Sequence, residues 1–253
     1  MYLWRRSASQ KWWRDNEIEL RTIAGDQLAV IERPHRKRVQ LEVASESRGA
    51  LQKLEKQFGG RITKLPRNWL KRSLRRKTKP IKVGNRQLII PAGAAFGTGE
   101  HATTAMSLRL LEKISRQWRR GWSMVDLGTG SGILALAAKF LGGKRVIGID
   151  NDRIAISTAK QNARLNKISG VQFRVSDVRH WNFPRNIDIV TANLFSDLLI
   201  EIVPKVKHVR CLILSGILGK QERGMRRALR RNKIEIFEVR RRGKWVAILA
   251  GRK

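Results

Sequence analysis

The order of hydrophobic and polar residues after position 120 predicts strands and helices in alternation. Short runs rich in β-branched residues are separated by segments with a helical period, such as 132–143 and 156–167. This alternation predicts an α/β fold in which helices cover both faces of a mostly parallel sheet. The predicted strands are MVDLG (124–128), RVIGID (145–150), VQFRVSD (171–177), IDIVTANL (187–194) and CLILSGI (211–217).

The last two apolar runs are IEIFEVRRR (234–242) and KWVAILAGR (244–252), joined by Gly243 alone. A crossover helix between parallel strands takes about a dozen residues or more, so this connection is too short for one. The two runs therefore predict an antiparallel hairpin at the edge of the sheet.

The N-terminal part has an alternation of its own. RVQLEV (38–43) and RITKL (61–65) predict strands on either side of a helix within 46–60. The segment 20–32 predicts a hairpin that turns at Gly25-Asp26. The chain is thus expected to contain a small α+β module (1–66), a basic connector (67–90) and the main α/β domain (91–253).

The charge of the chain is strongly positive, with 54 Lys and Arg against 20 Asp and Glu and a formal net charge of +34. From Lys56 through Gly99 there are 12 basic residues, Lys56 included, and no acidic one, and a second basic zone begins at Lys205. Such blocks are typical of proteins that contact polyanions, which makes ribosomal RNA a predicted partner. The alternative is a general bias toward basic residues on solvated faces.

The composition is that of a soluble globular protein, with 42% hydrophobic residues. No apolar run approaches the roughly 20 residues that span a bilayer, so no membrane association is predicted. Cys211 is the single cysteine and cannot form an internal disulfide, which favours a reducing compartment, the cytoplasm. The first 14 residues are basic like a transit peptide but lack the apolar core of a secretory signal. The oligomeric state is not predicted.

The segment VDLGTGSGIL (125–134) is the strongest sign of a ligand site. A buried strand leads into Gly128, Gly130 and Gly132 and then directly into an apolar helix. Glycines at such a junction allow a sharp turn and the close approach of a bulky ligand. The spacing is not the G-x-G-x-x-G of dinucleotide binders, so a nicotinamide cofactor is disfavoured.

Two carboxylates follow at the ends of the next predicted strands. Asp150 is placed to accept hydrogen bonds from both hydroxyls of a ribose, and Asp177 could meet the exocyclic amine of an adenine. The alternative for Asp150 is a cap on the helix that follows, although Asn151 or Asp152 could serve there. A glycine loop with two such acids is typical of a site that binds a nucleoside and has no phosphate-binding group. S-adenosylmethionine is the common cofactor that fits such a site.

Asn193 closes the fourth predicted strand, in TANLF. Its carbonyl oxygen could accept a hydrogen bond from an amine and hold the nitrogen lone pair in line with a methyl donor. The alternative is that Asn193 caps a helix that starts near Ser196. No cluster of His, Cys and acidic residues has the spacing of metal ligands, so no metal is predicted.

Taken in order, five stretches of the chain resemble the PrmA family, the methyltransferases of ribosomal large-subunit protein eleven. The resemblance implies a Rossmann-like class I fold that depends on S-adenosylmethionine. It also implies N-methylation of lysine side chains and of an N-terminal amine on a ribosomal protein. The stretches are PAGAAFGTGEHATT (91–104), DLGTGSGILALAA (126–138), GIDND (148–152), TANLF (191–195) and LILSGIL (212–218).

The same resemblance implies the site residues. Those carried over as cofactor contacts are Thr104, Gly128, Asp150 and Asn193, with Gly130 beside them in the glycine loop. Phe96, Gly97 and Thr98 would belong to a lid over the methionine end. His101 is a candidate for the substrate pocket, with a structural place in the lid as the alternative. The family's N-terminal module is shaped like a ferredoxin, whereas the first 66 residues here are short, tryptophan-rich and only loosely similar.

Two alternative functions stay open from the residues. A methyltransferase of this kind could act on another protein or on RNA, which the basic segments would favour. A methyltransferase fold without activity could also serve as a nucleic-acid-binding module. The complete set of Gly128, Gly130, Asp150 and Asn193 argues against the inactive form, because a degenerate site would tolerate the loss of at least one.

Overall fold

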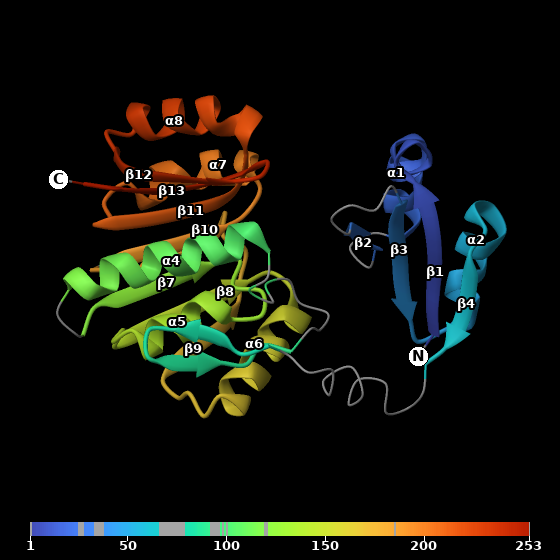
Figure 1. Ribbon diagram of the computed structural model, residues 1–253, viewed down its shortest axis with the longest axis horizontal. Coiled ribbons are helices and arrows are strands. Elements are labelled where there is room, and N and C mark those ends of the chain that lie inside the picture. The colour runs from blue at the N-terminus through green and yellow to red at the C-terminus, as the bar shows by residue number, and fades with distance from the viewer. Residues whose placement is uncertain are drawn as a thin grey trace. The chain divides into compact units, whose positions relative to one another are not determined.

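The computed structural model describes residues 2–24, 28–32, 38–65, 79–91, 97, 99, 101–118, 121–184 and 186–252. The chain divides into two compact units, Met1–Arg72 and Ser73–Lys253. Each unit has its own sheet and its own hydrophobic core (Figure 1).

The first unit is a four-stranded antiparallel sheet with two helices. The strands lie in the order β2-β3-β1-β4, and the elements follow one another as β-α-β-β-α-β, which is the ferredoxin-like arrangement. The described residues of the first unit therefore have the ferredoxin-like topology. Its elements are β1 (Tyr2–Ser9), α1 (Gln10–Ala24), β2 (Leu28–Glu32), β3 (Arg38–Ser45), α2 (Arg48–Phe58) and β4 (Arg61–Lys64).

The buried residues of the first unit confirm the predicted strand at 38–43 and contradict the predicted hairpin at 20–32. Strand β3 buries every second residue, as the alternation in RVQLEV predicts. The hairpin predicted over 20–32 is wrong, because Leu20 and Ala24 lie on the buried face of α1 together with Trp13, at helical spacing. Only Leu28–Glu32 of that segment is a strand, and Gly25-Asp26 lie outside the described residues.

The second unit is built on a seven-stranded sheet in the order β12-β13-β11-β10-β7-β8-β9. Strands β7 to β11 are parallel to one another, and β13 is antiparallel to both of its neighbours, β11 and β12. The predicted C-terminal hairpin is therefore confirmed. The elements are β5 (Ile81–Val83), β6 (Arg86–Leu88), α4 (Ala102–Gln117), β7 (Ser123–Leu127), α5 (Ile133–Phe140), β8 (Arg145–Asp150), α6 (Arg153–Leu165), β9 (Val171–Val175), β10 (Ile189–Asn193), α7 (Ser196–Val206), β11 (Cys211–Leu218), α8 (Glu222–Arg231), β12 (Glu235–Arg242) and β13 (Trp245–Gly251).

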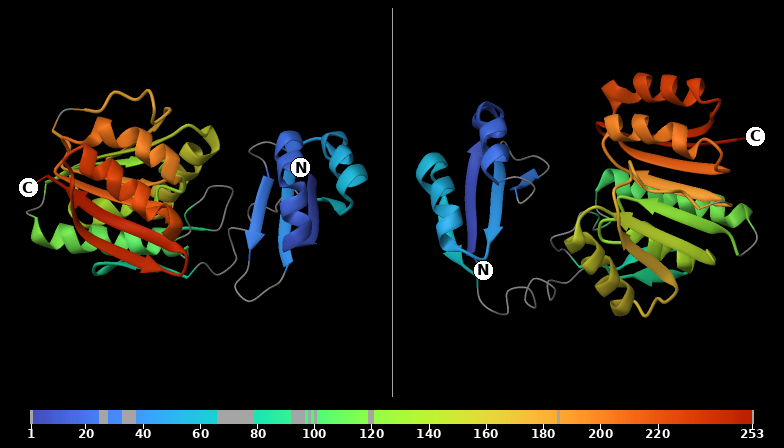
Figure 2. Two further views of the ribbon diagram at one scale, coloured as in Figure 1. Left: turned by 90° about the horizontal axis from the view of Figure 1, so that it is seen from above. Right: turned by 180° about the vertical axis from the view of Figure 1, so that it is seen from behind.

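Helices cover both faces of this sheet, as predicted. Successive strand residues point to opposite faces, so Met124 packs with the cluster under α4, α5 and α6, and Val125 packs with the cluster under α7 and α8. Figure 2 shows α4 and the pair α7 and α8 on opposite sides of the sheet. The sheet is thus buried on both faces, which is why its strands read as nearly continuous apolar runs.

The end of the predicted connector belongs to the second unit. Strands β5 and β6 form a small antiparallel hairpin, and Val83, Leu88 and Ile90 are buried in the same cluster as α4 and α5. Asn166, at the end of α6, exchanges two hydrogen bonds of 2.7 Å with the backbone of Ile89. Residues 79–91 therefore pack as part of the fold, because their apolar side chains have a core to enter. Positions 67–78 lie outside the described residues.

No helix in the described part of the chain is long and apolar enough to cross a membrane.

Candidate active site

The predicted site residues converge on one edge of the second sheet. From β7 the chain proceeds outward to β8 and β9, then returns to β10 on the other side of β7. In open α/β sheets, ligands bind beyond the carboxyl ends of the strands at such a reversal. The ends of β7, β8 and β10 carry the glycine loop, Asp150 and Asn193, so these three features meet at the reversal point.

The glycine loop between β7 and α5 requires its glycines for backbone reasons. Gly128, Gly130 and Gly132 have φ values of 67°, 53° and 80°, a region that side chains with a Cβ seldom adopt. A Cβ on Gly128 would lie 2.4 Å from Leu194 Cδ2, in the segment that follows Asn193. The loop is therefore packed directly against the end of β10.

Asp150 is hydrogen-bonded to the glycine loop. Gly130 N–H donates to Asp150 Oδ2 at 2.9 Å, and Asp152 N–H donates to Asp150 Oδ1 at 3.0 Å. The alternative that Asp150 caps the following helix is wrong, because Asp152 occupies the N-cap position of α6 and accepts from Ile154 N–H at 2.7 Å. Asp150 thus stands at the carboxyl edge of β8 with both oxygens accepting from backbone amides, one of them in the glycine loop.

Asp126 is a functional candidate that the sequence interpretation missed. It lies within β7 under the glycine loop and accepts hydrogen bonds of 2.6 Å from both Thr129 Oγ1 and Thr191 Oγ1. Burial raises its pKa to about 6, and the nearby charge of Asp150 adds to this effect. Asp126 therefore links the glycine loop to Thr191 of β10, which lies two residues before Asn193. The available signal was an acid inside the otherwise apolar run MVDLG.

Asn193 ends β10 beside α4. Its Nδ2 donates to Thr104 Oγ1 at 3.4 Å, a long contact that joins two of the predicted site residues. The alternative of a helix cap is wrong, since Phe195 occupies the N-cap position of α7. The contact uses the amide nitrogen, so the carbonyl oxygen Oδ1 is the atom that can accept from a substrate amine.

A second link between α4 and the sheet lies behind Asn193. Ser107 and Ser215 form a buried hydrogen bond of 2.7 Å, and Ser107 Oγ also donates to the carbonyl of Thr103. Ser215 is paired with Asn193 in the parallel register of β10 and β11. Polar side chains inside an apolar helix and strand were the sequence signal for this link, which holds the first turns of α4 against the strand ends.

The predicted lid is described only in part. Gly97 is buried, and its carbonyl accepts from Ser131 Oγ at 2.6 Å, so this residue lies against the glycine loop. Phe96 and Thr98 lie outside the described residues. Gly99 has a φ of 85°, a conformation that residues with a Cβ seldom adopt, and a Cβ there would also displace the end of the Ile81 side chain, 2.4 Å away.

His101 occupies the N-cap position of α4. Its Nδ1 is 2.8 Å from Thr103 Oγ1, and its ring meets the edge of Trp245 with centroids 5.2 Å apart. Burial, reinforced by the charge of Lys244, lowers the pKa of His101, so the ring is neutral near pH 7. These contacts give His101 a structural role at the start of α4.

Asp177 lies just beyond β9, at the same edge of the sheet. Ser176 N–H donates to the carbonyl of Asp150 at 2.9 Å, which brings the ends of β8 and β9 together. The Asp177 carboxylate accepts from Arg179 N–H at 2.8 Å, and this bond is the main cause that lowers its pKa. The position suits the adenine role, which stays a prediction, although the carboxylate is also engaged in its own turn.

The chemistry of the site is that of acids and a neutral amide around a polar loop. Asp126 and Asp150 flank the glycine loop, and its sequence GTGSG contains no basic residue. Within the residues that the structure describes, no group of three or more His, Cys, Asp or Glu could hold a metal ion. The arrangement can accept hydrogen bonds from sugar hydroxyls and from an amine.

Sheet order and strand-end site together define the class of this protein, a Rossmann-like fold of the class I methyltransferases. Magnesium protoporphyrin IX methyltransferase from Synechocystis PCC 6803, solved with bound SAM, shares the fold with a TM-score of 0.50 and 20% identity. The similarity covers 59% of this chain and 79% of that chain. At this identity the likeness concerns the fold alone.

The chain belongs to the family described as ribosomal protein L11 methyltransferase (PrmA), which it matches over residues 40–253. The resemblance found in the sequence is thereby confirmed. A relative from Lacticaseibacillus paracasei, named ribosomal protein L11 methyltransferase, is 36% identical over 173 residues, 67% of this chain and 54% of the relative. The crystal structure of ribosomal protein L11 methylase from Lactobacillus delbrueckii subsp. bulgaricus aligns with a TM-score of 0.61 and 30% identity, over 69% of this chain and 91% of that chain. This chain covers 54% and 62% of the length of the first two curated relatives.

Proposed function

We propose that this chain is an S-adenosylmethionine-dependent methyltransferase of lysine side chains and of an N-terminal amine on ribosomal protein L11. Membership of the family supports the reaction and the substrate. The observation that carries the proposal is the placement of Asp150 and Asn193 at the ends of β8 and β10, on either side of the glycine loop that follows β7.

The residues present fit a nucleoside-sulfonium cofactor. A carboxylate offers about four acceptor positions, and the backbone amides of Gly130 and Asp152 use two of those of Asp150. Two positions therefore remain for the hydroxyls of a ribose. The spacing G-x-G-x-G of this loop departs from the G-x-G-x-x-G of loops that bind a pyrophosphate, which suits a nucleoside without a pyrophosphate better. In this proposal Gly128, Gly130 and Thr104 contact the cofactor as well, and Asp177 contacts the adenine.

S-adenosylmethionine supplies, when bound, a methyl group made electrophilic by the positive sulfur. Asn193 accepts a hydrogen bond from the substrate amine through Oδ1 and holds the nitrogen lone pair in a productive direction. Lysine has a pKa of about 10.4 in water, so presenting it neutral near pH 7 costs about 4 to 5 kcal/mol. Exclusion of water lowers that pKa, because a dry site disfavours the ammonium form. Phe96, Gly97 and Thr98 are proposed as the lid that excludes water.

The first unit is proposed as the module that recognises the ribosomal protein. Its ferredoxin-like topology supports this role. We also propose contact with ribosomal RNA, supported by the basic zone from Lys205, and a place in the cytoplasm, where ribosomes are modified and a single cysteine stays reduced.

The test is transfer of a labelled methyl group. The purified chain is incubated with labelled S-adenosylmethionine and either free ribosomal protein L11 or ribosomal RNA, and the modified amines are located by mass spectrometry. We expect label on lysine and N-terminal amines of the protein. Label on the RNA alone would contradict the substrate, and binding of the cofactor without transfer to any acceptor would favour an inactive binding module.

A further inference from the structure

Helix α8 carries the densest group of unpaired cations in the described part of the chain. Its sequence ERGMRRALRR contains five arginines and one acid. That acid, Glu222, pairs with Arg226 and Arg241. Arg223, Arg227 and Arg230 are exposed, and no carboxylate among the described residues is within ion-pair distance of them.

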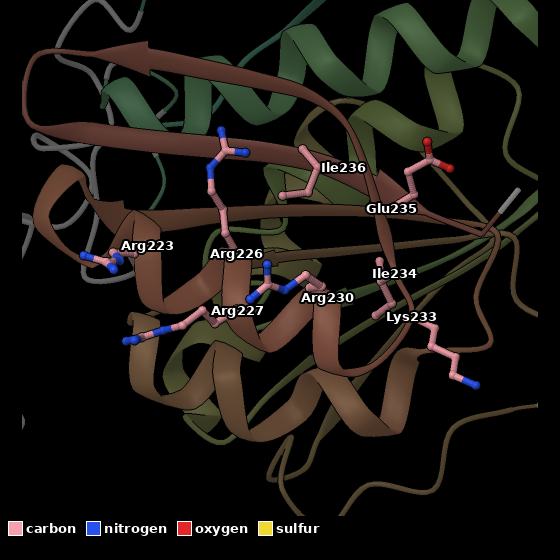
Figure 3. Close-up of a pocket in the computed structure, with 8 residues that line it drawn as sticks. All are labelled: Arg223, Arg226, Arg227, Arg230, Lys233, Ile234, Glu235 and Ile236. Carbon is pink, nitrogen blue, oxygen red and sulfur yellow. The ribbon is translucent and has the colours of Figure 1, made fainter.

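The cations of α8 line an open hollow of about 670 Å³ against the start of β12. Figure 3 shows the arginine side chains projecting from α8, with Lys233 on the turn that follows. Glu235 is the one acid that lines this hollow. The lining residues are Arg223, Arg226, Arg227, Arg230, Lys233, Ile234, Glu235 and Ile236. Five cationic residues and one acid line the hollow, so positive charge dominates it.

The helix that presents these cations is held firmly. Met225 and Leu229 are completely buried in the core, on the opposite side of α8 from the arginines. Arg241 of β12 donates two hydrogen bonds of 2.6 Å and 2.9 Å to Glu222, so the first turn of α8 is tied to the neighbouring strand. A charged surface on a fixed helix loses less conformational entropy on binding than a charged tail would.

The start of α8 is also connected to the candidate active site. Gln221 Oε1 accepts hydrogen bonds from Ser196 Oγ at 3.0 Å and from the backbone amide of Leu218 at 3.1 Å. Ser196 is the first residue of α7 and follows Asn193 by three positions. The cationic helix therefore begins at the edge of the sheet that carries Asn193.

We propose that Arg223, Arg227, Arg230 and Lys233 form a docking surface for the phosphate backbone of RNA. The guanidinium group of arginine matches phosphate oxygens with paired hydrogen bonds, and arginines outnumber lysines on this helix. Contacts of this type position a polyanion without reading its sequence. The inference rests on the RNA contact proposed above and assigns it to one surface, which begins at the edge of the sheet that carries Asn193 and extends along α8 toward the opposite edge, where β12 begins.

The test compares two variants that remove the same charge. One carries Arg223→Gln, Arg227→Gln and Arg230→Gln on α8. The matched control carries Lys160→Gln, Arg164→Gln and Arg174→Gln, three exposed cations at the opposite end of the sheet. Glutamine keeps helix propensity, and circular dichroism verifies the fold of both variants. Binding of a fluorescently labelled RNA hairpin is measured by anisotropy across a range of salt concentrations.

Each lost phosphate contact reduces the magnitude of the negative slope of log affinity against log salt concentration by about one unit. The α8 variant is therefore expected to have a slope about three units smaller in magnitude than that of the unaltered chain. For the control variant, the magnitude of this slope is expected to fall by less than about one unit. Equal losses in both variants would overturn the assignment to α8 while leaving the RNA contact in place. Failure of the unaltered chain to bind the RNA would overturn both proposals. Competition by polyglutamate as strong as that by unlabelled RNA of equal charge would identify an acidic protein segment as the occupant instead.

Discussion

At the scale of single residues, Asp150 and Asp152 lie two positions apart and have different roles. Asp150 accepts from the glycine loop, whereas Asp152 caps α6. We expect Asp150→Ala to weaken S-adenosylmethionine binding by about 10- to 100-fold, the worth of hydrogen bonds to a charged group. Isothermal titration calorimetry measures this directly. An unchanged dissociation constant would remove Asp150 from the cofactor site.

Asp152→Ala is the control for that experiment. Loss of its bond to Ile154 N–H should lower the free energy of unfolding by about 1 kcal/mol, as expected for a helix cap. Cofactor affinity should stay within about two-fold of the unaltered chain, because Asp152 contacts Asp150 through its backbone amide, which the substitution keeps. The pair of variants therefore distinguishes a local effect on α6 from an effect on the ligand.

Asp126 makes stability depend on pH in an identifiable direction. Its pKa in the folded chain is raised from 3.8 to about 6, so between these values the folded state keeps a proton that the unfolded state has lost. The stabilisation is full below pH 3.8 and is lost as the pH rises to about 6, by an amount on the order of 3 kcal/mol. Asp126→Asn should remove this trend. Urea unfolding of both proteins across the range measures it, and a constant difference between them would contradict the raised pKa.

The residues of the site could be predicted from the sequence where the strand order alone decides their position. Asp150 and Asn193 end parallel strands, and such ends meet at one edge whatever the details of packing. Asp126 could not be found this way, since an acid inside a strand has a role only once Thr129 and Thr191 are known to face it. The local signal, an acid inside an apolar run, does not identify the residues that face it.

At the scale of elements, the approach of β10 to β11 depends on Gly216. It lies at an irregularity of β11 with a φ of 87°, and a Cβ there would lie 2.3 Å from the backbone oxygen of Leu194. A backbone atom cannot move aside as easily as the end of a side chain can. Gly216→Ala must therefore displace the segment after Asn193. We expect a loss of about 3 kcal/mol in the free energy of unfolding together with a large fall in methyl transfer.

Gly219→Ala is the matched control for Gly216. A Cβ at Gly219 would have its nearest neighbour at 3.8 Å, an ordinary contact, and the residue lies just beyond β11, in the 3-10 helix Gly219–Gln221. Gly219→Ala should change the free energy of unfolding by less than about 0.5 kcal/mol, and methyl transfer should be retained. Similar losses in both variants, measured by thermal unfolding and by a transfer assay, would show that the close approach of Leu194 is unimportant.

The elements that the sequence predicted poorly are those in which short-range pattern and tertiary context disagree. Residues 20–24 look like the first arm of a hairpin beside Gly25-Asp26, but they complete the buried stripe of a helix that starts at Gln10. Strands β5 and β6 lie in a basic stretch that reads as a connector, and only the core around Leu88 and Ile90 gives them a structural role. In both cases the burial partner lies elsewhere in the chain.

At the scale of the whole molecule, the two units have separate cores, and this separation can be tested by truncation. A chain of residues 73–253 keeps both clusters of the second unit, as well as Asp150 and Asn193. We therefore expect it to fold and to bind S-adenosylmethionine within about three-fold of the full chain, because its core is complete. Transfer to ribosomal protein L11 should fall by at least about ten-fold, since the proposed recognition module is missing.

Three measurements decide the outcome of this truncation. Thermal unfolding and calorimetry report on folding and on cofactor affinity, and methyl transfer to L11 reports on recognition. A truncated chain that fails to fold would contradict the independence of the second unit. One that folds and transfers methyl groups as fast as the full chain would contradict the recognition role of the ferredoxin-like unit. In that case the specificity for the substrate must lie in the second unit, where α8 and the edge around Asn193 are the described surfaces able to provide it.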